Sequence, residues 1–183
     1  MKTRELTLVS LFVALTAAGA FVKIPLAPVP ISLQTLFVML AGVVLGAKLG
    51  ALSQAAYVIL GLLGLPIFTA GGGPGYILQP SFGYLIGFIF GAYITGKTLE
   101  GSGRGLDRGR GALRVFLAVL AGLLAVYICG VGYLYFLLNF VIGKGIALSS
   151  AIKVGFLVFL PGDLAKAAVV ALVGNRLRRV LIS

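Results

Sequence analysis

The chain has 183 residues, of which 60% are hydrophobic and 10% are charged, and its mean hydropathy is +1.15. This composition leaves too little polar surface to cover a water-soluble globule, so it predicts an integral membrane protein. The net charge of +11 does not indicate a nucleic-acid-binding protein. The basic residues occur in short groups between apolar runs instead of along one face.

The apolar runs predict an all-α protein. A helix needs about 20 apolar residues to cross about 30 Å of hydrocarbon. The uncharged stretches predict six transmembrane helices, near residues 4–23, 32–47, 48–64, 81–98, 112–142 and 148–176, in one membrane-embedded domain that covers residues 1–183. The first run also resembles a secretory signal peptide, but because more spans follow it we expect a retained helix.

The distribution of basic residues predicts the orientation in the membrane. Six helices place both termini on the same side. The opposite side receives only Lys23, Lys144 and Lys153, and Lys166 falls within a span, so the other eleven of the 15 basic residues flank the side of the termini. The positive-inside rule therefore predicts that the N- and C-termini are cytoplasmic.

The two outer connections, residues 24–31 and 65–80, are rich in proline, glycine and apolar side chains and carry no charge. Non-helical backbone near membrane depth is tolerated where it is buried in protein or lines a cavity. We expect these loops to fold as lids over a binding site. The alternative is a packed extracellular cap without a ligand.

An acidic and a basic residue, Asp163 and Lys166, stand three positions apart within the last apolar run. Each would cost about 2.5 to 3.5 kcal/mol at the centre of a span if unpaired, and the spacing places both on one helix face. Apolar replacements of such pairs are often neutral or stabilising, so the pair favours a functional site over a structural ion pair. Pro161 and Gly162 interrupt the helix one turn before it. An acceptor beside a cationic donor suits a small ligand with N–H groups, a carbonyl and an acid.

Other motifs are better explained by packing. The stretch GAYITGKT, Gly91 to Thr98, matches a phosphate-binding loop literally, but it ends an apolar helix instead of following a strand. Cys129 lies in an apolar run and is expected to be a core residue. Enzyme chemistry is disfavoured because the chain has no histidine and no serine beside an activating base. Glycines at spacing four are expected to allow close helix packing within the chain: Gly42, Gly46 and Gly50, and Gly83, Gly87 and Gly91.

Four segments together resemble the BioY family, the biotin-specific substrate-binding (S) components of energy-coupling-factor (ECF) transporters. They are PVPISLQTLFVMLAGVVLGAKLG (28–50), YVILGLLGLPIFTAGGG (57–73), PSFGYLIGF (80–88) and PGDLAK (161–166). The resemblance implies the ECF S-component fold in a prokaryotic plasma membrane. It also implies capture of biotin from outside, without a cofactor, and partners that supply the energy: a transmembrane coupling subunit and two cytoplasmic ATPases.

The resemblance also implies roles for individual residues. Asp163 and Lys166 match the polar pair of the family and are assigned to the polar groups of biotin, with their division between the ureido ring and the carboxylate left open. Further implied pocket members are Gly72, Gln79, Tyr84 and Gln54, and Ala14 and Ala18 match a helix motif that faces the coupling subunit. Two alternatives remain: an S component for another vitamin, or a stand-alone proton-coupled secondary transporter in which the Asp–Lys pair relays protons.

Overall fold

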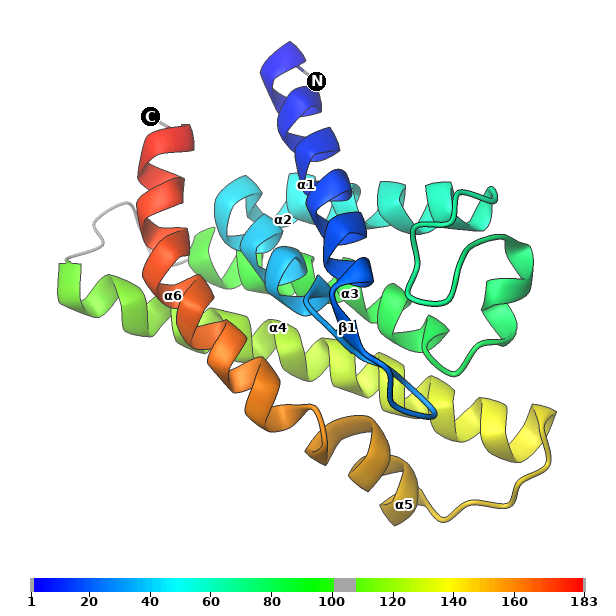
Figure 1. The fold of residues 1–183 in the computed structure, drawn as a ribbon. Helices are drawn as coiled ribbons and strands as arrows, with labels where there is room; N and C mark the ends of the chain where they lie inside the picture. Colours follow the sequence, from blue (N-terminus) through cyan, green and yellow to red (C-terminus); the bar gives the residue numbers. More distant parts are fainter. Residues whose placement is uncertain (1, 101–107, 183) are drawn as a thin grey trace.

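The computed structural model describes residues 2–100 and 108–182, and in that part of the chain it is helical apart from one short hairpin and the loops (Figure 1). The main helices are α1 (Thr3–Phe21), α2 (Gln34–Leu62), α3 (Phe82–Glu100), α4 (Arg108–Phe136), α5 (Leu148–Ile152) and α6 (Leu160–Ile182). The hairpin consists of β1 (Lys23–Ile24) and β2 (Ile31–Ser32), and three further helical turns are η1 (Pro74–Leu78), η2 (Leu137–Val141) and η3 (Lys153–Leu157).

Five stretches of the described chain are long and apolar enough to cross a membrane, and they are Thr3–Phe21, Gln34–Leu62, Phe82–Glu100, Gly111–Val141 and Leu148–Gly174. The fourth continues from α4 into η2, and the fifth runs from α5 through η3 into α6. Apolar side chains face outward at helical spacing along α4, where Leu117, Leu124 and Ile128 are 55%, 58% and 66% exposed. Such a stripe is expected on a helix that contacts lipid. The chain is therefore a multi-pass membrane protein.

The second stretch is interrupted close to the predicted boundary between two helices. The sequence predicted separate helices at 32–47 and 48–64, and α2 covers both stretches with a break of non-helical backbone at Gly46 (φ 79°, ψ −177°). Few residues other than glycine adopt such a φ without strain. After the break, the Ala47 N–H donates to Glu100 Oε1 at 2.9 Å, which satisfies one backbone donor of the second arm. The described chain thus has five candidate spans where the sequence predicted six.

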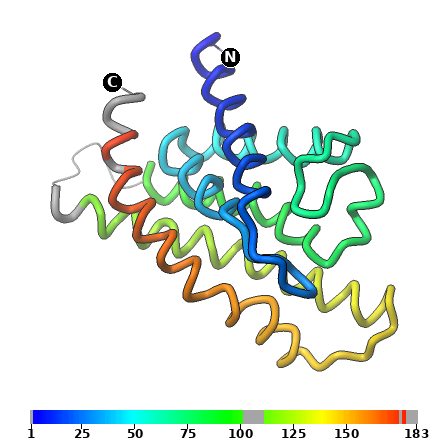
Figure 2. Tube along the Cα trace, in the orientation of Figure 1, coloured from blue at the N-terminus to red at the C-terminus, as the bar shows by residue number. Residues whose placement is uncertain are grey.

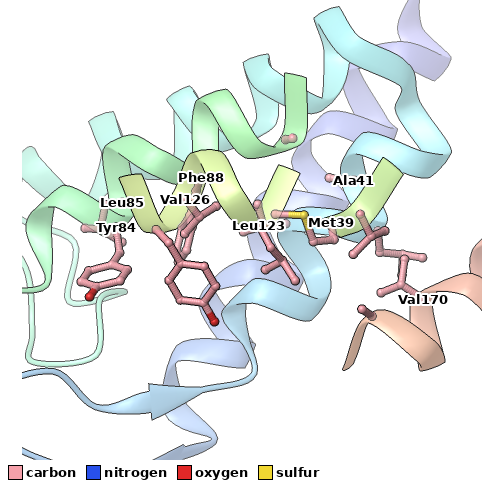
Figure 3. Packing of buried hydrophobic residues seen from close by; sticks show 14 of the residues in the cluster. Met39, Ala41, Tyr84, Leu85, Phe88, Leu123, Val126 and Val170 are labelled. Atoms are coloured by element: carbon pink, nitrogen blue, oxygen red, sulfur yellow. The ribbon is translucent and has the colours of Figure 1, made fainter. Parts of the chain in front are cut away.

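Close helix packing explains the spaced glycines. A Cβ on Gly42 would lie 2.5 Å from the carbonyl oxygen of Ala92, and one on Gly87 would lie 2.8 Å from Val126 Cα. The prediction that these glycines pack within the chain is confirmed at both positions. The core between α2, α3 and α4 is mostly apolar, and the labelled side chains in Figure 3, among them Met39 and Phe88, belong to it.

The hairpin and the loops 63–81 and 142–147 lie away from the two termini (Figure 1, Figure 2). Figure 1 shows the start of α1 and the end of α6 at the upper end of the view, and Figure 2 traces the hairpin and the loops 63–81 and 142–147 to the lower and right-hand side. The second arm of α2 is tied to the loop that follows it, because Tyr57 donates to the Ile67 carbonyl at 2.7 Å.

Candidate functional site

The acid and base that the sequence singled out contact each other. Lys166 Nζ lies 2.7 Å from Asp163 Oδ1, and the two side chains are 13% and 4% exposed. The spacing of three on α6 accounts for the contact, as predicted from the sequence. An ion pair this deeply buried is stable only if its remaining donors and acceptors are also satisfied.

Three residues from distant parts of the chain satisfy them. Thr35 Oγ1 donates to Asp163 Oδ1 at 2.9 Å, and Tyr127 donates to Asp163 Oδ2 at 2.5 Å. Lys166 Nζ donates to the Ser32 carbonyl at 2.6 Å and to Thr35 Oγ1 at 3.0 Å. The pair is thus the centre of a network that joins β2, the start of α2, α4 and α6.

The start of α6 explains why the pair can sit there. Pro161 occupies the first turn of the helix, where a missing N–H costs no intrahelical hydrogen bond. Asp163 lies in the same turn, where the positive end of the helix dipole favours a carboxylate. The π-helical turn η3 precedes α6, and Tyr84 donates to the Gly155 carbonyl within it at 2.7 Å. The interruption predicted at Pro161 and Gly162 therefore begins in η3, before the proline.

A cavity opens beside the network. Its polar lining residues outside the loops 24–31 and 63–81 are Asp163, Lys166, Thr35, Tyr127, Ser32 and Gln34. The other lining residues are aromatic or apolar or come from those loops: Tyr84, Leu85, Phe88, Val126, Phe159, Val29, Pro30, Thr69, Tyr76 and Ser81. The space that the centre of a water-sized molecule can occupy is about 40 Å³, which is room for a few waters. The cavity is thus closed around a small volume.

The two outer loops contribute to the lining of this cavity, and their role as a lid stays a prediction. Val29 and Pro30 of the hairpin and Thr69 and Tyr76 of the loop after α2 all line it. The two loops are joined by the amine of Lys23, which donates to the Thr69 carbonyl. Within the second loop, the Thr69 hydroxyl and the Tyr76 hydroxyl are 2.9 Å apart. The lid is therefore held by a few polar contacts over an apolar interior.

The structure brings some predicted pocket residues together and places others elsewhere. Tyr84 lines the cavity with Asp163 and Lys166, whereas Gln79 is exposed on the lid. Gly72 packs against the carbonyl of Leu65, which a Cβ would approach to 2.1 Å, so that lid position admits no side chain.

Gln54 lies apart from the cavity lining, fully buried between α1 and α2. Its Nε2 donates to Ser53 Oγ at 3.1 Å and to Thr16 Oγ1 at 3.3 Å. This arrangement fits a role in joining the two helices.

Sequence reasoning missed Thr35, Ser32 and Tyr127. Their partners lie 128, 134 and 36 positions away along the chain, so no local spacing could reveal the contacts. The available signal was weak: Tyr127 is a hydroxyl-bearing residue inside a long apolar run, and Ser32 and Thr35 begin another.

The small residues Ala14 and Ala18 of α1 are both exposed, as is Leu11 one turn earlier at 48%. The opposite face of the helix is buried, with Phe12 and Thr16 facing the rest of the chain. The predicted motif therefore lies on the outer surface of α1, where it is available to another protein or to lipid.

Comparisons with known proteins identify the family of the chain. Residues 1–183, the whole chain, match the BioY family. A probable biotin transporter BioY from Lysinibacillus sphaericus is 42% identical over 99% of this chain and 90% of its own, and one from Pyrococcus horikoshii is 40% identical over 97% and 98%. The crystal structure of the S-component for biotin from an ECF-type ABC transporter matches with a TM-score of 0.82 and 31% identity, over 98% of this chain and 95% of that one. The chain belongs to the BioY family.

Proposed function

We propose that this protein captures biotin as the substrate-specificity component of an ECF-type ABC transporter. The single observation that carries the proposal is the buried Asp163–Lys166 pair, which opens onto a cavity closed by two outer loops. Relatives named as biotin transporters, at about 40% identity over nearly the whole chain, support the choice of vitamin.

The chemistry of the cavity suits that ligand. The Asp163 carboxylate can accept from the ureido N–H groups, and the Lys166 amine can donate to the ureido carbonyl or to the ligand carboxylate. Tyr84, Phe88 and Phe159 offer apolar surface for the sulfur-containing bicycle. Bound ligand would have to replace some of the present partners of the pair, because all of its polar atoms are already hydrogen-bonded.

Loading requires the lid to move. The present cavity has room for only a few waters, so a vitamin-sized molecule enters only after part of the lid moves. The lid consists of the hairpin and the loop 63–81. Gly72 and Gln79 belong to that moving loop, and we assign them to lid closure and place Gln54 outside the site.

We propose further that the two arms of α2 each cross the membrane, which gives six spans and puts both termini in the cytoplasm. The basic flanks and the common position of the two ends in Figure 1 support this topology. Single cysteines placed at Lys48 and Ser149, with Cys129 changed to alanine, test it with a membrane-impermeant thiol reagent. We expect labelling at Lys48→Cys only from the inside and at Ser149→Cys only from the outside.

The energy for transport would come from partners. We propose a transmembrane coupling subunit and two cytoplasmic ATPases in a prokaryotic plasma membrane, with Ala14 and Ala18 on the docking surface. Their exposure on α1 supports this, because small side chains let another helix approach closely. The chain itself would be a transport component without enzymatic activity or a cofactor.

Calorimetric titration of purified protein with biotin tests the central proposal. We expect saturable binding with one site per chain, weakened strongly by Lys166→Met. Preference for another vitamin in the same titration would favour an S component of different specificity. Proton-driven uptake by the chain reconstituted alone would favour a secondary transporter.

A further inference from the structure

A second hollow lies on the other side of the hairpin from the cavity described above. It is formed where the hairpin tip, the end of α4, the loop 142–147 and α5 with η3 meet, and its lining includes Ala27, Pro28, Leu138, Lys144 and Ser150. The space open to the centre of a water-sized molecule is about 310 Å³, far more than the 40 Å³ of the closed cavity. This groove has room for a small organic molecule without any rearrangement.

Only the hairpin tip separates the two hollows along the chain. Ala27 and Pro28 line the groove, and the next two residues, Val29 and Pro30, line the closed cavity. The same four-residue segment is thus a wall of both spaces.

One cation is built into the rim of the groove. Lys144 stands between Gly143 and Gly145, whose positive φ angles of 74° and 60° form a tight turn. The Asn139 side chain donates to the Ile146 carbonyl at 3.1 Å and fixes the end of that turn. The ammonium group is therefore presented by an ordered loop above an otherwise mostly apolar surface.

No carboxylate among the described residues competes for this charge. Glu5 and Glu100 lie at the start of α1 and the end of α3, at the other end of the molecule, and Asp163 is buried against Lys166. An anion that reaches the groove from solvent therefore does not compete with a described carboxylate of the protein for Lys144. An apolar groove with a single cation at its rim fits a carboxylic acid that has an apolar body.

We propose that the groove is the vestibule through which the ligand reaches the closed cavity: Lys144 holds the ligand carboxylate while the hairpin segment 27–30 moves aside. This inference rests on the proposed function, since it takes biotin as the anion. The ligand would occupy the groove only on its way, and it would leave Lys144 behind when it reaches Asp163 and Lys166.

A residue that contacts the ligand only on its route changes the barrier and leaves the end states as they were. Its substitution must then lower the association and dissociation rates by the same factor and leave Kd unchanged. That signature separates the vestibule from the binding site, where substitutions alter Kd.

The experiment measures both rates of biotin binding by stopped-flow tyrosine fluorescence on detergent-purified protein. The chain contains no tryptophan, and Tyr84 and Tyr127 line the closed cavity, so the signal reports arrival there. Ser150→Phe fills the groove from an exposed lining position, and Ser149→Phe, exposed but outside the lining, is its matched control. Lys144→Met removes the cation, and Lys153→Met removes an exposed cation that is not part of the lining.

We expect Ser150→Phe to slow association and dissociation together by about fivefold or more, because the ligand must pass the new side chain. Lys144→Met should slow both by about two- to fourfold at low salt, the effect of one screened charge close to the anion. Biotin methyl ester carries no carboxylate, so Lys144→Met should not change its binding rates, whereas Ser150→Phe should still slow them. Both controls should stay within about twofold of the wild type.

Unchanged rates in both groove variants would overturn the inference, as would a change in Kd that accounts for the whole effect. An effect of Lys144→Met that appears only in bilayers with anionic phospholipid would assign the groove to a lipid headgroup and also refute it. Absence of biotin binding by the wild-type chain would refute the proposed function itself, which equilibrium titration detects separately.

Discussion

Removing the cation of the buried pair is the most direct test of the site. In the Lys166→Met variant, Asp163 keeps its hydrogen bonds from Thr35 at 2.9 Å and Tyr127 at 2.5 Å but loses its ionic partner at 2.7 Å. The Asp163 side chain is 4% exposed, so its carboxylate is then left without a charged partner in a largely buried position.

We expect Lys166→Met to lower both the stability of the protein and its affinity for biotin. Breaking a buried ion pair by removing one partner destabilises a protein by about 3 to 5 kcal/mol, and the two surviving hydroxyl donors argue for the lower end. Biotin binding should weaken by about 2 to 5 kcal/mol, since the ligand then meets an uncompensated charge. That range corresponds to a Kd increase of about 30-fold to a few thousand-fold.

Calorimetry on detergent-purified protein measures the Kd, and thermal unfolding measures the stability. Asp163→Asn, which removes the negative charge at nearly constant volume, should show a comparable loss of affinity. The double variant should unfold at a higher temperature than Lys166→Met alone, because no unpaired charge remains. If both single variants bind biotin as tightly as the wild type, the assignment of the pair to the ligand is wrong.

Three further outcomes are expected. Tyr127→Phe removes the donor to Asp163 Oδ2 and should lower the unfolding free energy by about 1.5 to 3 kcal/mol, measured by chemical denaturation. Gly130→Ala should impair biotin binding in calorimetry, because its Cβ would lie 2.3 Å from the Tyr84 ring and push that ring into the cavity. Ala14→Trp should leave biotin affinity unchanged but prevent copurification with a coupling subunit, because the residue is exposed on α1.

The first two of these predictions have matched controls. Tyr133→Phe is the control for Tyr127→Phe, because both residues are on α4. The Tyr133 hydroxyl donates to the Ile77 carbonyl, away from the buried pair, so its removal should leave Asp163 undisturbed. Gly132→Ala is the match for Gly130, because nothing lies within 4 Å of its Cβ position. A Tyr127→Phe variant of wild-type stability, a Gly130→Ala variant of wild-type affinity, or an Ala14→Trp variant that still assembles would each contradict the corresponding reasoning.

Local spacing in the sequence was sufficient for the membrane class and for the central pair. Hydropathy identifies spans because the hydrocarbon core demands continuous apolar runs, and a separation of three places Asp163 and Lys166 on one face of any helix. The uncharged outer loops could be read as a lid for a similar reason, since such segments are stable only when they cover something.

The tertiary structure decided which other residues join the pair. Thr35 and Tyr127 meet Asp163 only after α2, α4 and α6 pack together, and Gln54 meets Thr16 only after α1 packs against α2. At the break in α2, the Ala47 N–H likewise finds its acceptor, Glu100, at the end of another helix. Helical periodicity acts within a turn or two, whereas the contacts that complete a site join residues dozens of positions apart, so only the packed chain determines them.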